Sequence, residues 1–319
     1  MTPLGPGAEF DIIRRILKDA APPGPEIALA SGDDCALVRA GDSYLALTVD
    51  LTVQDAHFLL DWGSAELVGG RAVRAALSDL AAMAAQPVGV LVALNLPAGS
   101  GSELAEQVAE GCRAAAEAYG APLIGGDLSR GGSGLALDVA ALGTVDEPLL
   151  RSGVRPGDEL WVTGRLGAAA AAVQAWKAGR ALPDEWRQRF WAPEPRIREA
   201  RWLAERGASA GIDLSDGLAA DAGHLSAASG VGIELDWEAV PAPAGVEPAL
   251  ALAGGEDYEL LVALPGGILT AELVSEFERT FGIPLTRVGR AVTGIGVRVF
   301  RDGEEVALDA SGHDHFKAG

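Results

Sequence analysis

The sequence predicts a mixed α/β (α+β) protein built from two domains, and three observations support that prediction. The chain has 319 residues, which is the length of two domains of ordinary size. Apolar residues make up 49% of it, so each domain has enough of them to form a core. Segments with helical and strand-like patterns alternate along the chain, and several neighbouring strands suggest antiparallel pairs, as in mixed α/β folds.

Helices in the first half are predicted where apolar residues recur every three or four positions. In residues 65–85, for example, Val73, Leu77 and Leu80 form one stripe. Strands are predicted from short apolar runs bounded by turn residues. The expected helices span residues 8–19, 65–85 and 102–119, and the expected strands span 35–39, 43–50, 88–96, 121–124 and 135–145.

A segment rich in Pro and Gly, residues 146–158, is the predicted junction between the domains. We therefore divide the chain into residues 1–148 and 149–319. The second part is expected to hold a strand over 159–163, an Ala-rich helix after 164–167, helices over 195–206, 217–229 and 270–281, a strand ending at 212–213, and strands over 231–235, 258–264, 285–291 and 296–300.

Composition excludes two classes of partner. The formal net charge of −20 argues against non-specific binding to nucleic acid and to anionic membrane surfaces. The apolar stretch 80–96 is interrupted and too short to span a bilayer. Cys35 and Cys112 are isolated, and the N-terminus lacks the pattern of a signal peptide, so the expected location is the cytoplasm.

The most informative feature is a set of short motifs rich in aspartate. They read Gly32-Asp33-Asp34, Thr48-Val49-Asp50, Ser78-Asp79-Leu80, Gly125-Gly126-Asp127 and Asp213-Leu214-Ser215-Asp216. Carboxylate oxygens are the ligands that hard divalent cations prefer. The only lysines are Lys18, Lys177 and Lys317, and none lies in a Gly-Lys-Ser/Thr loop. The motifs therefore indicate divalent cations that bring a polyphosphate to the protein.

Each of these motifs also has a structural interpretation. Asp79 stands in a nearly apolar helical segment, where it is a metal ligand, a helix cap or the ion-pair partner of Arg71 or Arg74. Gly-Asp pairs also occur in ordinary turns. Ser215 or Asp216 is either the N-cap of the next helix or part of a site where cations hold phosphate at that helix N-terminus.

Two further segments carry polar groups beside aromatic ones. The segment Gly254-Gly255-Glu256-Asp257-Tyr258-Glu259-Leu260 is either a solvated loop or a place where Glu256 recognises a cationic or hydrogen-bond-donating ligand. His57 and the terminal His313-Asp314-His315-Phe316 are the other such positions. Zinc is disfavoured there because no third soft ligand is near in sequence.

Seven motifs in a fixed order carry a resemblance to a known family. They are GDDCALV (32–38), TVDLTVQDAHF (48–58), ALSDLAAMAAQP (76–87), GGDLSRG (125–131), DLSDGL (213–218), GGEDYEL (254–260) and GHDHF (312–316). With them the chain resembles the thiamine-monophosphate kinase family of the aminoimidazole-ribonucleotide-synthetase-like superfamily. The resemblance implies a homodimer in which the N-terminal domains form a barrel. Residues 1–148 would bind metal and ATP, and residues 149–319 would close the cleft for ATP and substrate.

The resemblance also implies roles for individual residues. The implied magnesium ligands are Asp33, Thr48, Val49, Asp50, Asp79, Asp127, Asp213 and Asp216, with Val49 acting only through its backbone. The implied ATP contacts are Gly126, Asp127, Arg151 and Ser215. The implied contacts to thiamine monophosphate are His57, Glu256 and Phe316, the last against the aromatic ring system. The chain departs from the family pattern where a tyrosine that often touches ATP is replaced, at Ala109 or Glu110.

The activity that the resemblance implies is ATP-dependent conversion of thiamine monophosphate to thiamine diphosphate, in thiamine diphosphate biosynthesis, with several Mg²⁺ ions. Direct in-line transfer needs no covalent nucleophile, because the attacking phosphate is already an oxyanion. A selenophosphate synthetase is disfavoured because residues 1–31 contain no cysteine, and an aminoimidazole-ribonucleotide synthetase is disfavoured by GGEDYEL and the terminal HDHF. A non-catalytic sensor of nucleotide or thiamine phosphate, and a purely structural acidic dimer, are the alternatives from other classes.

Overall fold

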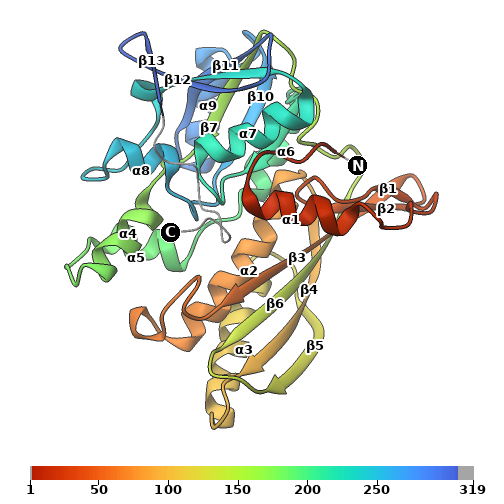
Figure 1. The fold of residues 1–319 in the computed structure, drawn as a ribbon, viewed down its shortest axis with the longest axis vertical. Helices are drawn as coiled ribbons and strands as arrows, with labels where there is room; N and C mark the ends of the chain where they lie inside the picture. The colour runs from red at the N-terminus through yellow and green to blue at the C-terminus, as the bar shows by residue number, and fades with distance from the viewer. Residues whose placement is uncertain (1, 308–319) are drawn as a thin grey trace.

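Two β-sheets, one in each half of the molecule, organise the fold (Figure 1). The computed structural model describes residues 2–307. The six-stranded sheet has the order β1-β2-β3-β6-β4-β5, and the seven-stranded sheet has the order β13-β12-β9-β11-β7-β10-β8. The mixed α/β class that the sequence predicts is confirmed.

The first sheet is antiparallel except at one edge. Its strands are β1 (Ile27–Leu29), β2 (Ala36–Ala40), β3 (Ser43–Val53), β4 (Gln86–Leu96), β5 (Leu123–Arg130) and β6 (Ala136–Val145). Strand β5 pairs with β4 in parallel, because the helix α3 (Ser102–Ala118) joins them as a crossover. Strand β5 is longer than the predicted 121–124, and β1 lies in a segment for which the sequence predicts no strand.

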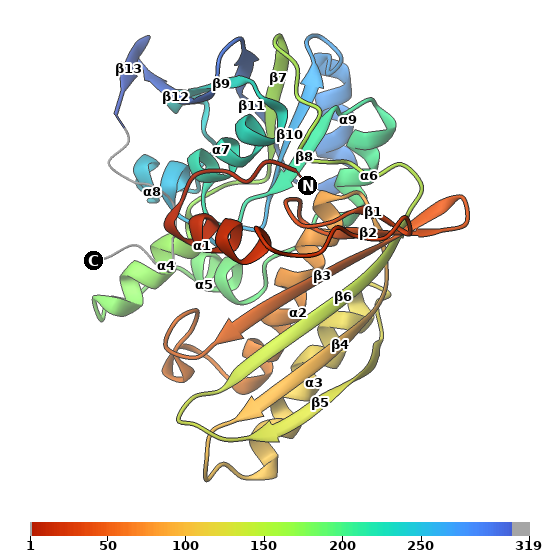
Figure 2. The same cartoon turned by 45° about the vertical axis from the view of Figure 1, so that its right-hand side comes forward.

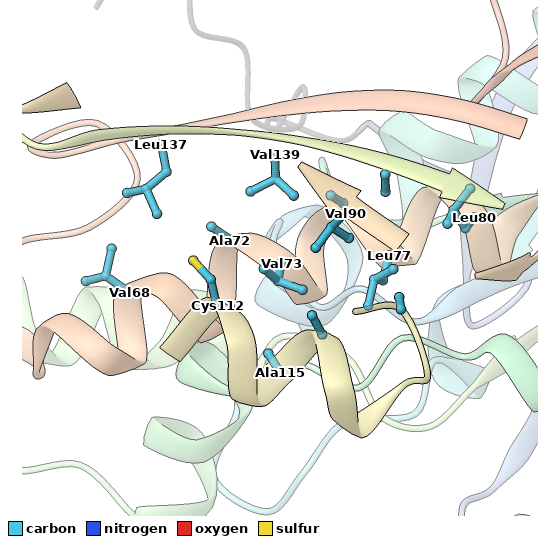
Figure 3. Packing of buried hydrophobic residues seen from close by; sticks show 14 of the residues in the cluster. Val68, Ala72, Val73, Leu77, Leu80, Val90, Cys112, Ala115, Leu137 and Val139 are labelled. Atoms are coloured by element: carbon cyan, nitrogen blue, oxygen red, sulfur yellow. The ribbon is translucent and has the colours of Figure 1, made fainter. Parts of the chain in front are cut away.

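Helices α2 (Ala65–Ala82) and α3 cover one face of this sheet (Figure 2). Figure 3 shows Val68, Val73 and Leu77 of α2 packed against Val90 and Val139 of the sheet. The opposite face carries no helix among the described residues, and every second side chain of β3 points there. These side chains are exposed, as are others of β4 and β5. The large apolar ones on the three strands include Leu47, Val49, Leu51, Leu91 and Ile124.

The second sheet is covered on both faces. Its strands are β7 (Asp158–Thr163), β8 (Ala210–Asp213), β9 (Gly232–Asp236), β10 (Leu260–Pro265), β11 (Leu285–Val292), β12 (Gly296–Arg301) and β13 (Glu304–Val306). Alternate residues of β10 join different cores: Leu261 packs with the cluster of α7 (Leu218–Ser229), and Val262 packs with the cluster of α6 (Ile197–Glu205) and α9 (Ala271–Phe281). This period of two is what a strand buried on both faces produces.

Three helices tie the halves together. The helices α4 (Ala168–Lys177) and α5 (Asp184–Trp191) come late in the chain, yet Ala172 and Phe190 belong to the core of the first sheet. In the other direction, Ala82 of α2 belongs to a core of the second sheet. The strands of the two sheets lie on either side of the predicted junction at residues 146–158, whereas the exact boundary after residue 148 stays a prediction.

The remaining elements are short or lie at the surface. They are α1 (Ala8–Leu17), α8 (Pro248–Ala253) and the 3-10 turns at Leu60–Trp62 and Trp237–Ala239. The sequence patterns missed α5, α8 and β13, because elements of three to eight residues show too little periodicity. None of the helices in the described part of the chain is both long and apolar enough to cross a membrane.

Candidate active site

Three carboxylates meet at the junction between the two sheets. Asp34 precedes β2, Asp79 lies on α2 and Asp213 ends β8, and they offer ligand oxygens that lie within 4.8 Å of one another. They meet because α2 packs against both sheets. We call Asp34, Asp79 and Asp213 the carboxylate cluster.

Hydroxyl groups fix two members of the cluster. The Thr48 hydroxyl of β3 donates to Asp79 Oδ2 at 2.5 Å, and the Ser78 hydroxyl donates to Asp213 Oδ2 at 2.8 Å. Asp79 thus makes neither the helix cap nor the ion pair with Arg71 or Arg74 that its structural interpretation allowed. The cluster explains why a half-buried carboxylate stands in an apolar helix.

Asp33 and Asp34 of one motif have different surroundings. The Asp33 carboxylate accepts a hydrogen bond from the backbone N–H of Arg151 at 3.2 Å. The Arg151 guanidinium binds Asp34 instead, with Nη2 to Oδ1 at 2.6 Å. Asp34, which the family resemblance did not select, is therefore the member of this motif that completes the cluster.

The cluster strongly disfavours its own ionisation. Burial, followed by the charge of Asp34, raises the pKa of Asp213 from 3.8 to about 8, although the Ser78 hydrogen bond acts the other way. Burial and the neighbouring Asp213 raise the pKa of Asp79 well above its usual range. Burial and Asp34 raise the pKa of Asp33 to about 7. Such a site is stable only with bound protons or cations.

Asp50 connects the cluster to a second polar pair. It lies two residues after Thr48 on β3 and so faces the same side of the sheet. Burial raises its pKa to about 6, while the charge of Arg71 lowers it. Arg71 is buried on α2 and forms an ion pair with Glu256 at 2.9 Å. Its guanidinium also lies 4.1 Å from the ring centroid of Phe190.

Glu256 and His57 line the same cavity, which has a volume of about 260 Å³. Its walls also include Trp62, Val173 and Lys177. His57 Nδ1 accepts a hydrogen bond from the backbone N–H of Val53 at 2.9 Å. Phe316, the third predicted contact to thiamine monophosphate, lies outside the described residues.

The other two carboxylates of GGEDYEL serve the fold. Asp257 accepts a hydrogen bond from the N–H of Gly167 at 2.7 Å. Glu259 is buried against Arg196 at 2.6 Å, Arg189 at 2.7 Å and the Thr163 hydroxyl at 2.7 Å. Of the three carboxylates in this motif, only that of Glu256 belongs to a residue that lines the cavity.

Two of the predicted ATP contacts lie away from the cluster. Gly126 and Asp127 are on β5, which is three strands from β3 and therefore about 14 Å from it at the usual strand spacing. A Cβ at Gly126 would lie 1.9 Å from the carbonyl oxygen of Val92, so only glycine fits there. The β5 residues Gly126 and Asp127 and the α3 residue Ala109 line a groove of about 450 Å³.

Arg151, Ser215 and Asp216 lie beside the cluster. The Ser215 carbonyl accepts a hydrogen bond from the N–H of Glu256 at 2.7 Å, which ties the loop after β8 to the loop at the cavity. The helix α7 has Gly217 as its N-cap, so neither Ser215 nor Asp216 caps it. The side chain of Val49 is 66% exposed on the open face of the sheet, so only its backbone is left for the role that the resemblance implies.

Sequence reasoning left out several residues of this site. They are Asp34, Arg71 and Ser78. Asp34 and Ser78 stand in motifs that had been singled out. Arg71 was named only as a possible partner of Asp79, and its pairing with Glu256 has no signal in the sequence, because only the fold brings the two together.

Comparison with known proteins finds relatives that match nearly the whole chain. Residues 32–145 match the family described as AIR synthase related protein, N-terminal domain, and residues 155–302 match its C-terminal domain. The thiamine-monophosphate kinase of Escherichia coli K12 is 36% identical over 326 residues, which cover 97% of this chain and 98% of that protein.

Two solved structures have the same fold. AaThiL complexed with AMPPCP and TMP is 30% identical, with a TM-score of 0.81 and 96% of each chain covered. The protein tt0281 of Thermus thermophilus is 32% identical, with a TM-score of 0.82, covering 94% of this chain and 98% of that one. Together with the carboxylate cluster, these likenesses show that the chain belongs to the thiamine-monophosphate kinase family of enzymes, within the AIR-synthase-related fold.

Proposed function

We propose that the chain transfers the γ-phosphate of ATP to thiamine monophosphate and forms thiamine diphosphate and ADP. The observation that carries the proposal is the carboxylate cluster, whose ligand oxygens lie within 4.8 Å of one another at the junction of the two sheets. Within residues 2–307, the only ion pair to the cluster comes from Arg151. The full-length similarity to thiamine-monophosphate kinases supports the choice of substrate.

The donors around the cluster suit magnesium. Carboxylate oxygens of Asp34, Asp79 and Asp213 and the hydroxyls of Thr48 and Ser78 are hard oxygen ligands. Magnesium ions held there, together with the predicted ligands Asp33, Asp50, Asp127 and Asp216, would neutralise the charge of the reacting phosphates. The number of carboxylates is consistent with several ions.

The phosphoryl transfer itself requires little chemistry from the side chains. The acceptor phosphate is already an oxyanion, so no residue has to remove a proton, and we assign no covalent nucleophile. The protein has to hold donor and acceptor in line and exclude water. We assign Arg151 and Ser215 to the ATP side, because both lie next to the cluster and Ser215 is bonded to the cavity loop.

The cavity at Glu256 and His57 is the proposed site for the thiamine part of the acceptor. A thiazolium cation and an aminopyrimidine present positive charge and N–H donors, which a carboxylate can bind. Trp62 and Val173 supply apolar walls for flat rings. Phe316 stays the predicted aromatic contact. The buried free thiols of Cys35 and Cys112 are in keeping with a reducing cytoplasm.

We also propose a homodimer built on the open face of the first sheet. That face presents the exposed apolar side chains of Leu47, Val49 and Leu51, and such patches usually mark interfaces. A second copy of the chain is the proposed occupant. Gly126 and Asp127 lie on the outer strand β5, about 14 Å from β3, so packing of two sheets is a way to bring them to a cluster. Val49→Asp should give monomers in sedimentation, and an unchanged dimer would contradict this arrangement.

The deciding experiment measures ADP and thiamine diphosphate formed from ATP, thiamine monophosphate and Mg²⁺, with EDTA as the control. Metal-dependent formation of both products in equal amounts supports the kinase. Saturable binding of thiamine monophosphate without either product would replace it with the sensor. Neither binding nor product would mean that the cluster serves another phosphate acceptor.

A further inference from the structure

Two acidic residues line the cavity of about 260 Å³, and their charges are balanced differently. Glu256 forms an ion pair with the buried Arg71 at 2.9 Å, so its charge already has a partner. Asp55 lies between β3 and the 3-10 turn at Leu60–Trp62, and within residues 2–307 its carboxylate has neither an ion pair nor a hydrogen bond. The uncompensated negative charge at this cavity is therefore that of Asp55.

A tight turn holds Asp55 at the cavity wall. The N–H of Asp55 donates to the carbonyl oxygen of Phe58 at 2.8 Å, and the N–H of His57 donates to that of Val53 at 2.9 Å. The φ of Asp55 is +69°, in the left-handed region that favours glycine. Non-glycine residues in this conformation are concentrated at functional sites. The turn thus carries a carboxylate at a position where glycine would be the less strained residue.

Lys177 is the other charged residue whose effect on a bound ligand has to be considered. It lines the same cavity from the last turn of α4. In the part of the chain that the structure describes, no ion pair joins it to Asp55 or to Glu256. Its side chain is exposed, so its ammonium group can extend into water and away from a bound cation. The Asp55 charge is therefore available to the ligand.

We propose that Asp55 gives the cavity its preference for a cationic ring, whereas Glu256, held by Arg71, accepts hydrogen bonds from the N–H groups of the ligand. The thiazolium ring of thiamine carries a permanent positive charge, which an unpaired carboxylate attracts whatever the pH of the solution above its own pKa. The inference rests on the proposed function, because that function supplies thiamine monophosphate as the ligand. Its test therefore measures binding separately from turnover.

The test compares thiamine monophosphate with deazathiamine monophosphate, in which a neutral thiophene ring replaces the thiazolium ring. Calorimetric titration of the full-length protein with Mg²⁺ and without nucleotide measures the Kd of each ligand. Asp55→Asn removes the charge but keeps the size of the side chain and its tolerance of the left-handed backbone. At low ionic strength it should raise the Kd of thiamine monophosphate about fivefold, the effect of a partly exposed charge pair, and leave the Kd of the neutral analogue unchanged.

Asp61→Asn is the matched control. Asp61 is an exposed carboxylate in the 3-10 turn that follows, and it does not line the cavity, so both Kd values should stay the same in this variant. The inference is overturned if Asp55→Asn binds thiamine monophosphate as tightly as the unsubstituted chain, if it weakens both ligands equally, or if Asp61→Asn has the same effect. Turnover in the same samples separates the two proposals. A chain that forms thiamine diphosphate but loses no affinity in Asp55→Asn keeps the proposed function without this inference, and a chain that neither binds nor converts thiamine monophosphate loses both.

Discussion

The carboxylate cluster and the contacts of Glu259 both place carboxylates in the interior, but their charges are balanced in opposite ways. Glu259 has two arginines and a hydroxyl within 2.7 Å, so one negative charge meets an excess of positive charge. The cluster has three carboxylates, and Arg151 forms the only ion pair to it within the described part of the chain. The first arrangement is complete without a ligand, and the second is complete only with cations or protons. A carboxylate that the fold leaves without enough positive charge therefore indicates function more strongly than a buried carboxylate as such.

The largest expected effects come from replacing one carboxylate in each region by its amide, which should affect turnover in one region and stability in the other. Asp213→Asn should lower turnover at least about a hundredfold, because a metal ligand is lost, while the free energy of unfolding stays the same or rises as repulsion in the cluster is relieved. Glu259→Gln should instead lower the free energy of unfolding by about 3 kcal/mol, because it leaves buried arginine charge without its partner. Turnover assays and urea unfolding at pH 7 measure both quantities. If Asp213→Asn keeps its turnover, or if Glu259→Gln keeps its free energy of unfolding, the two regions do not differ in the way described.

The second prediction concerns pH in the metal-free protein. The pKa of Asp213 is about 8 in the folded protein and 3.8 as its ordinary value, so between them the folded state binds more protons than the unfolded state. The free energy of unfolding must then fall as pH rises, by up to about 1.4 kcal/mol per pH unit for one group. Asp33, with a pKa of about 7, and Asp257, with a pKa of about 8, act in the same direction.

Measuring between pH 6.5 and 8 avoids the opposing effect of His224 protonation. The pKa of His224 is lowered to about 3, so its opposing contribution, which lowers stability as pH falls, is confined to pH values below 6.5. Urea unfolding in EDTA at pH 6.5 and 8 should show a loss of stability, which Asp213→Asn reduces and Mg²⁺ reverses. Because Asp257 lies outside the cluster, its share should persist in Asp213→Asn. A stability that stays level or rises across this window would contradict the raised pKa of the cluster.

These same residues show which features of the site can be predicted from the sequence and which cannot. The Asp-rich motifs were visible as short signals, and so was the α/β alternation, because both depend on neighbours in the chain. The partner of each charge was not visible. Nothing in GDDCALV distinguishes Asp34, bound to Arg151, from Asp33, bound to a backbone N–H. GGEDYEL likewise does not separate Glu256 at the cavity from Glu259 in the core. Such distinctions depend on contacts between residues that lie far apart in the sequence.

The Arg71–Glu256 pair is intermediate between the two regions and should give an intermediate effect. Arg71 is buried and Glu256 is partly exposed at the cavity. The two charges therefore balance each other, while the Glu256 side chain stays accessible to a ligand in the cavity. Arg71→Met should free the Glu256 side chain and raise the KM for thiamine monophosphate about tenfold, for a loss of about 1.5 kcal/mol. The kcat should change less, because Arg71 does not touch the cluster. Steady-state kinetics with thiamine monophosphate varied at saturating ATP measure both constants.

Two controls separate positioning from a general loss of structure. Arg71→Lys keeps the charge and should recover part of the KM, whereas Glu256→Gln should raise KM without the loss of the buried arginine. If Arg71→Met lowers kcat and leaves KM unchanged, Arg71 acts on the cluster through Asp50, whose pKa its charge already lowers. The Arg71–Glu256 pair would then contribute to the metal-binding carboxylates and not to binding of thiamine monophosphate.

The smallest expected effect comes from the hydroxyl that donates to the cluster. Ser78 is fully buried and donates to Asp213 Oδ2 at 2.8 Å, so it favours the ionised carboxylate that a cation needs. Ser78→Ala removes a hydrogen bond to a charged group, worth about 1.5 kcal/mol, and should raise the Mg²⁺ concentration for half-maximal turnover about tenfold or less. Turnover at saturating Mg²⁺ should be nearly restored, unlike that of Asp213→Asn, because the ligands themselves remain. If Ser78→Ala instead loses turnover at every Mg²⁺ concentration, the hydroxyl is itself a ligand, and the cluster holds its cations with hydroxyl oxygens as well as carboxylates.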